Sequence, residues 1–324
     1  PMQTRLTRFI VFFSAVLVAG VLPRAANADH DLDMEYAEHQ PLVTESMLLD
    51  ITRIGDMLVA VGERGHIVTS TDGVNWTQAE IVPTRSTLTT VFSAGGRLWA
   101  GGHDAVIVTS GDKGKTWTRQ FYDTHRQQAV MDIYFSDEDN GVAIGSYGLY
   151  LRTSDGGHSW EDATVDPEID YHLNKLLDLG DGRWLIAGEA GYSYRSYDHG
   201  ETWESLELPY QGSMWGALNT EGDCVLFFGL RGHVMESCDI GASWTEIETG
   251  TESSISGAAQ NEGFVLLAAN SGTILTRDDG GPFRVYHHSS GVDFASALAL
   301  GGTSFLLVGE GGVYHYPEVE QDDD

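Results

Sequence analysis

The chain has 324 residues, of which 48 are acidic and only 18 basic, so its formal net charge at pH 7 is −30. A surface this acidic repels nucleic acid and anionic lipid headgroups, and the composition therefore argues against both as partners. The length suits one large domain or two small ones.

The first predicted element is a secretory signal peptide over residues 1–28. Arg5 and Arg8 precede an apolar run at residues 9–22, and the small-x-small sequence at residues 26–28 follows it. This order is typical of a cleaved signal, and the apolar run is short for a membrane span; an uncleaved anchor is the alternative. Cleavage after Ala28 would remove three arginines and no acidic residue, leaving a charge of −33. We expect an exported, periplasmic protein without a membrane span after cleavage.

A turn motif of the form S/T-x-D-x-G-x-T/S-W recurs along the rest of the chain. Its four full copies lie 41 to 43 residues apart and contain Asp112, Asp155, Asp198 and Asp239. A shortened copy contains Asp72 and a degraded one contains Asp278. Aspartate is a common catalyst and Ca²⁺ ligand, but here the hydroxyl and carboxylate can bond the turn's own backbone while the tryptophan packs between repeats. We expect these Asp boxes to be structural.

A second marker has the same period. A small-x-x-small turn precedes each box, and a seventh one, from Gly309 to Gly312, has no box after it. Each period contains four short segments rich in Val, Ile, Leu and Tyr and punctuated by glycine, which is typical of a propeller blade. The sequence therefore predicts an all-β, seven-bladed β-propeller with four antiparallel strands per blade, spanning residues 29–317.

The mismatch between seven turns and six boxes predicts how the ring closes. Residues 36–46 have the same length and placement as residues 76–86, so Tyr36 would occupy a box tryptophan position. We expect residues 36–43 to form an N-terminal strand that completes the last blade and removes two open sheet edges. The acidic end, residues 318–324, is expected to be a disordered tail.

The two cysteines, Cys224 and Cys238, fall on successive strands at equal distances from the turn between them. In an exported protein such a pair is expected to form a disulfide, with two buried thiols as the alternative. The twelve histidines show no metal-binding spacing, and neither a nucleophile elbow nor a phosphate-binding loop occurs. We expect no cofactor and no metal.

The motifs resemble those of a known family. Gly62, Gly65 and Ile67 followed by Ser70 and Asp72 are similar to the repeat of the photosystem II assembly/stability factors, a group of Asp-box, or bacterial neuraminidase repeat, proteins. The resemblance implies an exported seven-bladed propeller that is not an enzyme and binds a membrane protein during complex assembly. Non-photosynthetic bacterial relatives are regarded as accessory to membrane complexes, including resistance–nodulation–division transporters. The photosynthetic members use a basic surface patch, whereas this chain is acidic, so the resemblance predicts the fold but not the client.

The expected partner-binding face carries the small-x-x-small turns and the connections between blades, because this side holds the off-pattern aromatic and basic residues. Trp215 is placed in one such connection, and Tyr171 and His172 in the longest one. The expected partner-binding residues are Arg64, Tyr122, Arg126, Tyr171, His172, Tyr210, Trp215, Arg231 and Phe294. The alternative function is glycan binding or sialidase-like chemistry, but the arginine-bearing motif that precedes the first box of sialidases is absent and their propellers have six blades.

Overall fold

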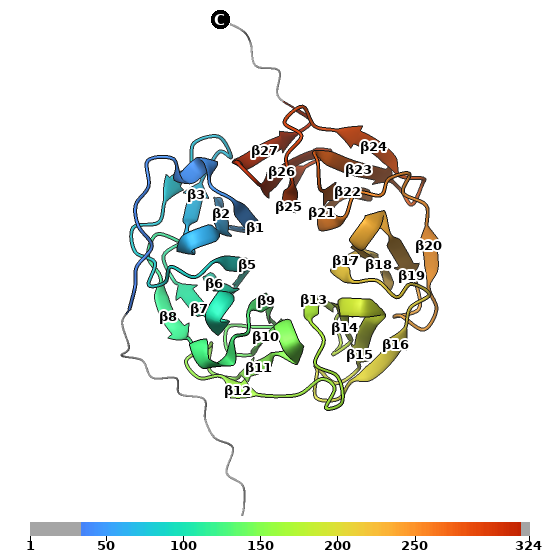
Figure 1. Ribbon diagram of the computed structural model, residues 1–324, viewed down its shortest axis with the longest axis horizontal. Helices are drawn as coiled ribbons and strands as arrows, with labels where there is room; N and C mark the ends of the chain where they lie inside the picture. The colour runs from blue at the N-terminus through green and yellow to red at the C-terminus, as the bar shows by residue number, and fades with distance from the viewer. Residues whose placement is uncertain (1–33, 319–324) are drawn as a thin grey trace, which may run out of the picture.

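The computed structural model describes residues 34–318, so the predicted signal peptide and residues 319–324 of the acidic tail lie outside the described residues. Seven antiparallel sheets are arranged in a ring, as Figure 1 shows, and residues of their first strands line a central channel. Each sheet is formed by strands consecutive in sequence. The prediction of an all-β, seven-bladed propeller is confirmed. Within residues 34–318, no helix has the length and apolar character needed to cross a membrane.

The first four blades each contain four strands, ordered from the channel outwards. Blade 1 contains β1 (Leu48–Ile54), β2 (Met57–Gly62), β3 (Ile67–Ser70) and β4 (Thr77–Gln78). Blade 2 contains β5 (Leu88–Ala94), β6 (Arg97–Gly102), β7 (Ile107–Ser110) and β8 (Thr118–Phe121). Blade 3 contains β9 (Val130–Phe135), β10 (Gly141–Gly145), β11 (Tyr150–Thr153) and β12 (Glu161–Asp162). Blade 4 contains β13 (Leu173–Asp178), β14 (Trp184–Gly188), β15 (Tyr192–Ser196) and β16 (Glu204–Glu207).

Blades 5 and 6 repeat this pattern, and blade 7 contains three strands within the described residues. Blade 5 contains β17 (Met214–Glu221), β18 (Cys224–Gly229), β19 (Val234–Ser237) and β20 (Thr245–Ile247). Blade 6 contains β21 (Ile255–Asn261), β22 (Phe264–Ala269), β23 (Thr273–Asp278) and β24 (Arg284–His287). Blade 7 contains β25 (Phe294–Gly301), β26 (Ser304–Gly309) and β27 (Gly312–Tyr316).

The remaining elements are single 3₁₀ turns. One of them, η1 (Val43–Glu45), precedes the first blade, and η4 (Thr124–Arg126) lies between blades 2 and 3. The others each join the second and third strands of a blade: η2 (Glu63–Gly65), η3 (His103–Ala105), η5 (Ser146–Gly148), η6 (Glu189–Gly191) and η7 (Leu230–Gly232).

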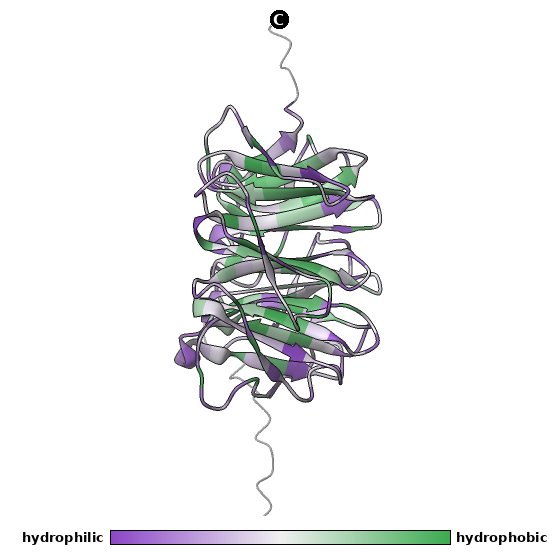
Figure 2. Cartoon of the chain, turned by 90° about the vertical axis from the view of Figure 1, so that its right-hand side faces the viewer, coloured by the Kyte–Doolittle hydropathy of each residue, from purple (hydrophilic) through white to green (hydrophobic). Residues whose placement is uncertain are grey.

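The core lies between neighbouring blades rather than in the channel. The second strand of every blade has a nearly continuous run of buried residues, because both of its faces pack against adjacent sheets. Figure 2 shows hydrophobic residues concentrated along the strands and hydrophilic residues mostly at strand ends and in loops. Between blades 2 and 3, for example, the buried ring of Trp99 stacks on Phe135 with 3.7 Å between centroids. Each blade thus completes its neighbour's core.

The loops divide between two faces. The 3₁₀ turns joining second and third strands lie beside the crossovers that connect one blade to the next: the backbone N–H of Glu63 donates to Met47, and that of His103 to Thr87. We call this the crossover face. The Asp boxes and the hairpins between first and second strands lie at the opposite ends of the strands, on the side that we call the box face.

The path of the N-terminal segment differs from the prediction. Residues 34–42 contain no strand, and they follow the outer edge of blade 1 rather than that of blade 7 (Figure 1). The Ala37 N–H donates to the Val82 carbonyl, and the Gln40 N–H to the side chain of Gln78. Tyr36 is 51% exposed and so does not take a box tryptophan's packed position. Because these backbone donors are used on blade 1, the segment does not extend the sheet of blade 7.

The segment nevertheless joins the last blade to the first. Val43 is buried in a cluster that contains Leu306 and Val308 of blade 7 together with Leu58 and Val68 of blade 1. The chain then enters β1 directly from η1. Residues 43–47 therefore occupy the place of an inter-blade crossover, and the ring closes through packing rather than through an added strand.

The predicted disulfide is present. Cys224 and Cys238 are joined with an S–S distance of 2.03 Å. Their strands pair with Val225 opposite Ser237, which sets the two cysteines side by side at the end of the β18–β19 ladder. The bond therefore links the second and third strands of blade 5, as their spacing from the turn predicts.

Candidate partner-binding surface

The Asp boxes are used to hold turns. In blade 4 the Ser196 hydroxyl donates to Asp198 at 2.8 Å and accepts from the Gly200 N–H at 2.9 Å. The Asp198 carboxylate also accepts from the Thr202 hydroxyl and N–H. These bonds, with the Thr202 hydroxyl contributing most, lower the pKa of Asp198 to about 2. All of the carboxylate's bonds serve its own turn, which supports a structural role.

The degraded box lacks this arrangement. Asp278 ends β23 and is exposed, and within the described residues its carboxylate makes none of the hydrogen bonds that characterise the other boxes. The turn instead closes through the backbone, with the Gly281 N–H donating to the Asp278 carbonyl. The box bonds therefore recur in blades 1 to 5 and stop before blade 6.

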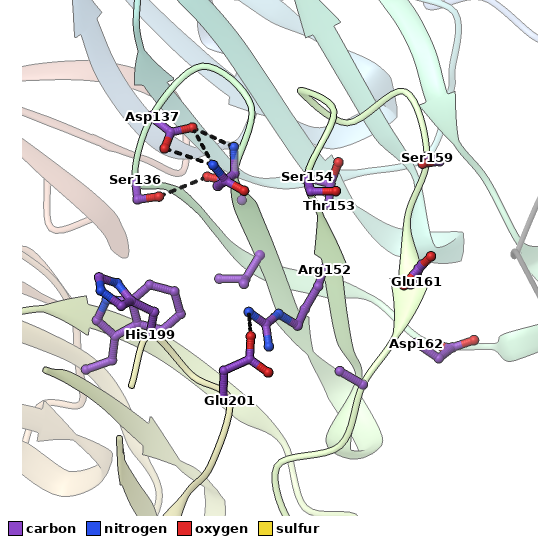
Figure 3. Close-up of a pocket in the computed structure, with 15 residues that line it drawn as sticks. Ser136, Asp137, Arg152, Thr153, Ser154, Ser159, Glu161, Asp162, His199 and Glu201 are labelled. Carbon is purple, nitrogen blue, oxygen red and sulfur yellow. Dashed lines mark hydrogen bonds and ion pairs between the residues drawn. The ribbon is translucent and has the colours of Figure 1, made fainter. Parts of the chain in front are cut away.

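A polar groove of about 680 Å³ lies between blades 3 and 4 on the box face (Figure 3). Its lining contains one arginine, Arg152, whose guanidinium pairs with the Glu201 carboxylate at 2.7 Å. Asp137, which also lines it, accepts hydrogen bonds from Asn140 of the same hairpin. A sialidase needs a cluster of arginines to hold its substrate's carboxylate. This groove offers a single guanidinium that is already neutralised.

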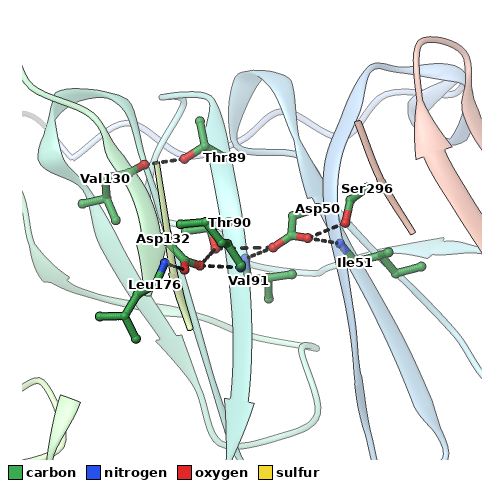
Figure 4. A network of polar contacts seen from close by, with 10 residues as sticks. Asp50, Ile51, Thr89, Thr90, Val91, Val130, Asp132, Leu176 and Ser296 are labelled. Carbon is green, nitrogen blue, oxygen red and sulfur yellow. Dashed lines mark hydrogen bonds and ion pairs between the residues drawn. The ribbon is translucent and has the colours of Figure 1, made fainter. Parts of the chain in front are cut away.

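The central channel is lined by side chains that tie each blade to the next (Figure 4). Asp50 of blade 1 accepts from the Val91 N–H of blade 2 at 2.9 Å, and Asp132 of blade 3 accepts from the Leu176 N–H of blade 4 at 2.9 Å. Hydrogen bonds from other inner-strand side chains cross four more of the interfaces between neighbouring blades. They are made by Thr89, Asn174, Ser256 and Ser296.

The charges in the channel compensate one another. The Lys175 ammonium lies 2.8 Å from Asp132. Burial disfavours its charged form, but Asp132 and Asp50 favour it by more, so the pKa of Lys175 is raised. Burial raises the pKa of the Asp50 carboxyl by more than Lys175 and several hydrogen-bond donors lower it, so this pKa is raised as well. Because Asp50, Asp132 and Lys175 bond across the interfaces between neighbouring blades, their role is structural.

Trp215 lies at the interface between blades 5 and 6, the one pair of neighbouring blades within residues 34–318 that no such hydrogen bond joins. It belongs to β17, the inner strand of blade 5, and not to an inter-blade connection as predicted. Within the described chain no side-chain hydrogen bond joins the inner strands β17 and β21 where they line the channel. Trp215 and Gly216 are the β17 residues at this point. The indole lines the channel and is 37% exposed. Trp215 is therefore neither a loop residue nor a fully buried core residue.

Each 3₁₀ turn between a second and a third strand places a non-glycine residue at its middle position in a left-handed conformation. Arg64, Tyr147 and Arg231 have φ of 55°, 55° and 56°, and all three are exposed. For a residue other than glycine this conformation costs about 1 kcal/mol or more. It directs the side chain away from the turn and into solvent. The structure places Arg64 in η2 and Arg231 in η7, both on the crossover face.

Tyr171 and His172 end the long crossover between blades 3 and 4, where two further tyrosines join them. Tyr147 is 57% exposed and its ring packs edge-on against His172 with 4.8 Å between centroids. Tyr171, 40% exposed, packs at 4.8 Å against Tyr192. We name Tyr147, Tyr171, His172 and Tyr192 the aromatic patch. Tyr147 and Tyr171 are its exposed rings, and His172 and Tyr192 are partly buried beside them.

Tyr210 and Tyr122 are only partly accessible. The Tyr210 ring stacks on His233 with 3.8 Å between centroids, and its hydroxyl donates to the Leu230 carbonyl. Tyr122 packs beneath the guanidinium of Arg119, which lies 4.6 Å from the ring centroid. Tyr210 therefore packs against the η7 turn of blade 5, and Tyr122 against the last strand of blade 2.

Two predicted contact residues are engaged elsewhere. Phe294 is 2% exposed and packs in the core against Tyr314, because it is the first inward-facing residue of β25. Arg126 forms a two-point ion pair with Asp162 and a further one with Asp123. The first residue is core and the second joins blades 2 and 3, so neither is available to anchor a partner.

Tyr147 and Tyr192 were missed by the sequence analysis. Tyr147 lies inside the turn from Gly145 to Gly148, at the position that Arg64 and Arg231 occupy in their own turns. Comparing that position across the repeats identifies Tyr147. Nothing in the sequence places Tyr192 beside Tyr171, because that contact depends on how the long crossover folds back. Within the described residues no group of three or more His, Cys, Asp or Glu side chains is arranged to hold a metal.

Comparison with known proteins agrees with these observations. Residues 119–271 match the family described as photosynthesis system II assembly factor YCF48. The photosystem II assembly lipoprotein Ycf48 of Synechococcus sp. (strain CC9902) is 33% identical over 88 residues, which are 26% of each chain. The chloroplastic photosystem II stability/assembly factor HCF136 of Oryza sativa subsp. japonica is 26% identical over 101 residues, 29% of this chain and 24% of that one. The matched part thus spans about a quarter of these relatives.

The solved structures extend the likeness of fold to the whole ring. YCF48 bound to D1 peptide has a TM-score of 0.70 and 18% identity, covering 87% of this chain and 96% of that one. YCF48 from Cyanidioschyzon merolae has a TM-score of 0.68 and 17% identity, covering 86% and 96%. At such low identity the likeness shows the fold alone. The match over residues 119–271 and the Asp-box repeats make this chain similar to the photosystem II assembly factor family, and the solved structures share its propeller fold.

Proposed function

We propose that this propeller is an exported, non-enzymatic protein that binds a segment of a membrane-protein partner on its crossover face. The observation that carries the proposal is the aromatic patch, in which Tyr147 and Tyr171 present exposed rings on a rigid scaffold. Exposed tyrosines on such a scaffold are the usual anchors of protein interfaces. A family relative of the same fold binds a peptide of D1. The role proposed is that of an assembly factor or accessory subunit of a membrane complex.

Export is supported by the Cys224–Cys238 bond, since disulfides persist in oxidising compartments such as the periplasm. The apolar run at residues 9–22 supports it from the sequence. A transporter complex of the resistance–nodulation–division type is the client class that the family resemblance proposes.

A site-specific crosslinking experiment tests the face. A photoreactive phenylalanine analogue replaces Tyr147 in one variant and Tyr197 in another. Tyr197 is a matched control because it is an exposed tyrosine within the blade 4 Asp box, on the box face. We expect crosslinks to one membrane protein, identified by mass spectrometry, from position 147 only. Crosslinks mainly from position 197 would show that the crossover face is the wrong side.

A further inference from the structure

The aromatic patch is built from three segments of blades 3 and 4. They are the turn at residues 146–148, the crossover at residues 163–172 and the turn with its following residue at 189–192. The Gly148 N–H donates to the Tyr171 carbonyl, and the Glu189 N–H to the His172 carbonyl, so the three segments are fastened together. The Tyr147 N–H also donates to His172 Nδ1. The rings therefore sit on a defined surface.

The same segments are acidic. They contain Asp166, Glu168, Asp170 and Glu189, and they contain no lysine or arginine. The Glu189 carboxylate accepts a hydrogen bond from the His172 backbone N–H at 3.1 Å, whereas Asp166, Glu168 and Asp170 form no ion pair within residues 34–318. Asp170 lies next to the Tyr147 turn, because a Cβ atom added to Gly148 would be 3.5 Å from the Asp170 Cα atom. Exposed rings and unpaired carboxylates thus share one surface.

This combination selects the charge of what binds. A tyrosine ring attracts a lysine or arginine cation to its face, and neighbouring carboxylates strengthen the attraction. An acidic segment would instead face like charge here and across a chain of net charge −30. Resting on the proposed function, we propose that the aromatic patch binds a basic segment of the partner, with lysine or arginine side chains lying over Tyr147 and Tyr171. An acidic segment held by Arg64 and Arg231 is the competing outcome.

Binding of two synthetic peptides to the purified protein tests the inference. Both are twelve residues long with glycine and serine spacers, one bearing four arginines and the other four glutamates. We expect the arginine peptide to bind more tightly, and the double variant Tyr147→Ala/Tyr171→Ala to weaken it about tenfold, the loss expected for two exposed cation–π contacts. The control Tyr197→Ala should leave its binding unchanged.

A second pair of variants separates the local carboxylates from general acidity. Glu168→Gln/Asp170→Asn removes two charges beside the patch, and Glu138→Gln/Asp139→Asn removes the same two residue types from an exposed box-face hairpin of blade 3. We expect only the first pair to weaken the arginine peptide, and the melting temperature of each variant checks that it is folded. Equal losses from both pairs would overturn the inference.

Tighter binding of the glutamate peptide than of the arginine peptide would also overturn the basic-segment inference. So would binding of the glutamate peptide that is lost in the variant Arg64→Ala/Arg231→Ala. Neither result changes what the crosslinks from position 147 show, because those crosslinks test the crossover face itself. If those crosslinks fail while the arginine peptide still binds at Tyr147 and Tyr171, the proposed function falls and the chemistry of the patch stands.

Discussion

Gly312 and Thr44 lie near opposite ends of the described chain, yet a Cβ atom added to Gly312 would come within 2.0 Å of the Thr44 carbonyl oxygen. The same close approach occurs inside the ring, where a Cβ atom added to Gly65 would come within 2.2 Å of the Thr84 carbonyl oxygen. Thr84 belongs to a covalent crossover between blades 1 and 2, whereas Thr44 reaches blade 7 only through packing. The N-terminal segment therefore replaces a crossover, which makes the blade 7–blade 1 seam the one to test for stability.

Val43→Asp should destabilise the ring, because it places a carboxylate in the cluster that joins blade 7 to blade 1. Val43 is 6% exposed and its neighbour Leu42 is 64% exposed. We expect Val43→Asp to lower the free energy of unfolding by about 3 kcal/mol or more and Leu42→Asp to change it by less than about 0.5 kcal/mol. Urea unfolding followed by tryptophan fluorescence measures both. Equal effects would mean that the segment does not close the seam.

Removing the disulfide should weaken blade 5. The bond closes a loop of about 15 residues, for which the chain-entropy view gives up to roughly 3 kcal/mol, and less where the hairpin persists after unfolding. We expect Cys224→Ser/Cys238→Ser to melt at a lower temperature than the parent, and reductant to affect the parent only. Alkylation of the unreduced protein followed by intact mass should show no modified thiol; two modified thiols would refute the bond.

The Asp boxes should make stability depend on acid pH. The folded pKa of Asp198 is about 2, below its usual 3.8, so its charged form favours the folded state. That contribution is complete above about pH 4 and is lost as the pH falls towards 2. We expect Asp198→Asn to lower the melting temperature by a few degrees at pH 7 and by less near pH 2. Asp278→Asn, in the box that lacks these bonds, should change neither value in thermal melts across this range.

Trp215→Ala distinguishes a channel residue from a core residue. Because the indole is partly exposed to the channel, we expect a loss of about 1 kcal/mol in the free energy of unfolding. Trp99→Ala, at a fully buried indole, should cost about 4 kcal/mol. Denaturant unfolding of both variants gives the comparison. A loss of several kcal/mol at Trp215 would make it a core residue and remove it from the partner-binding candidates.

The repeats decide most of the architecture before any tertiary contact is known. The spacing of the Asp boxes and the seven small-x-x-small turns predicts the blade number, because each blade is a local unit of strands that are consecutive in sequence. The Cys224–Cys238 pair is predictable for the same reason, since both cysteines lie in one hairpin. Interactions within a hairpin depend on the number of residues between the two partners and the turn, and this number can be read directly from the sequence.

Contacts between blades follow a different rule, and only the tertiary structure decides them. Residues 36–43 match a later segment in length, but the Ala37 N–H finds its acceptor on Val82 and the predicted strand does not form. Arg126 appears free in sequence until Asp162, in the next blade, takes its guanidinium. The aromatic patch likewise exists only where three separate segments meet. Such pairings depend on which surfaces the closed ring brings together, and no periodicity encodes them.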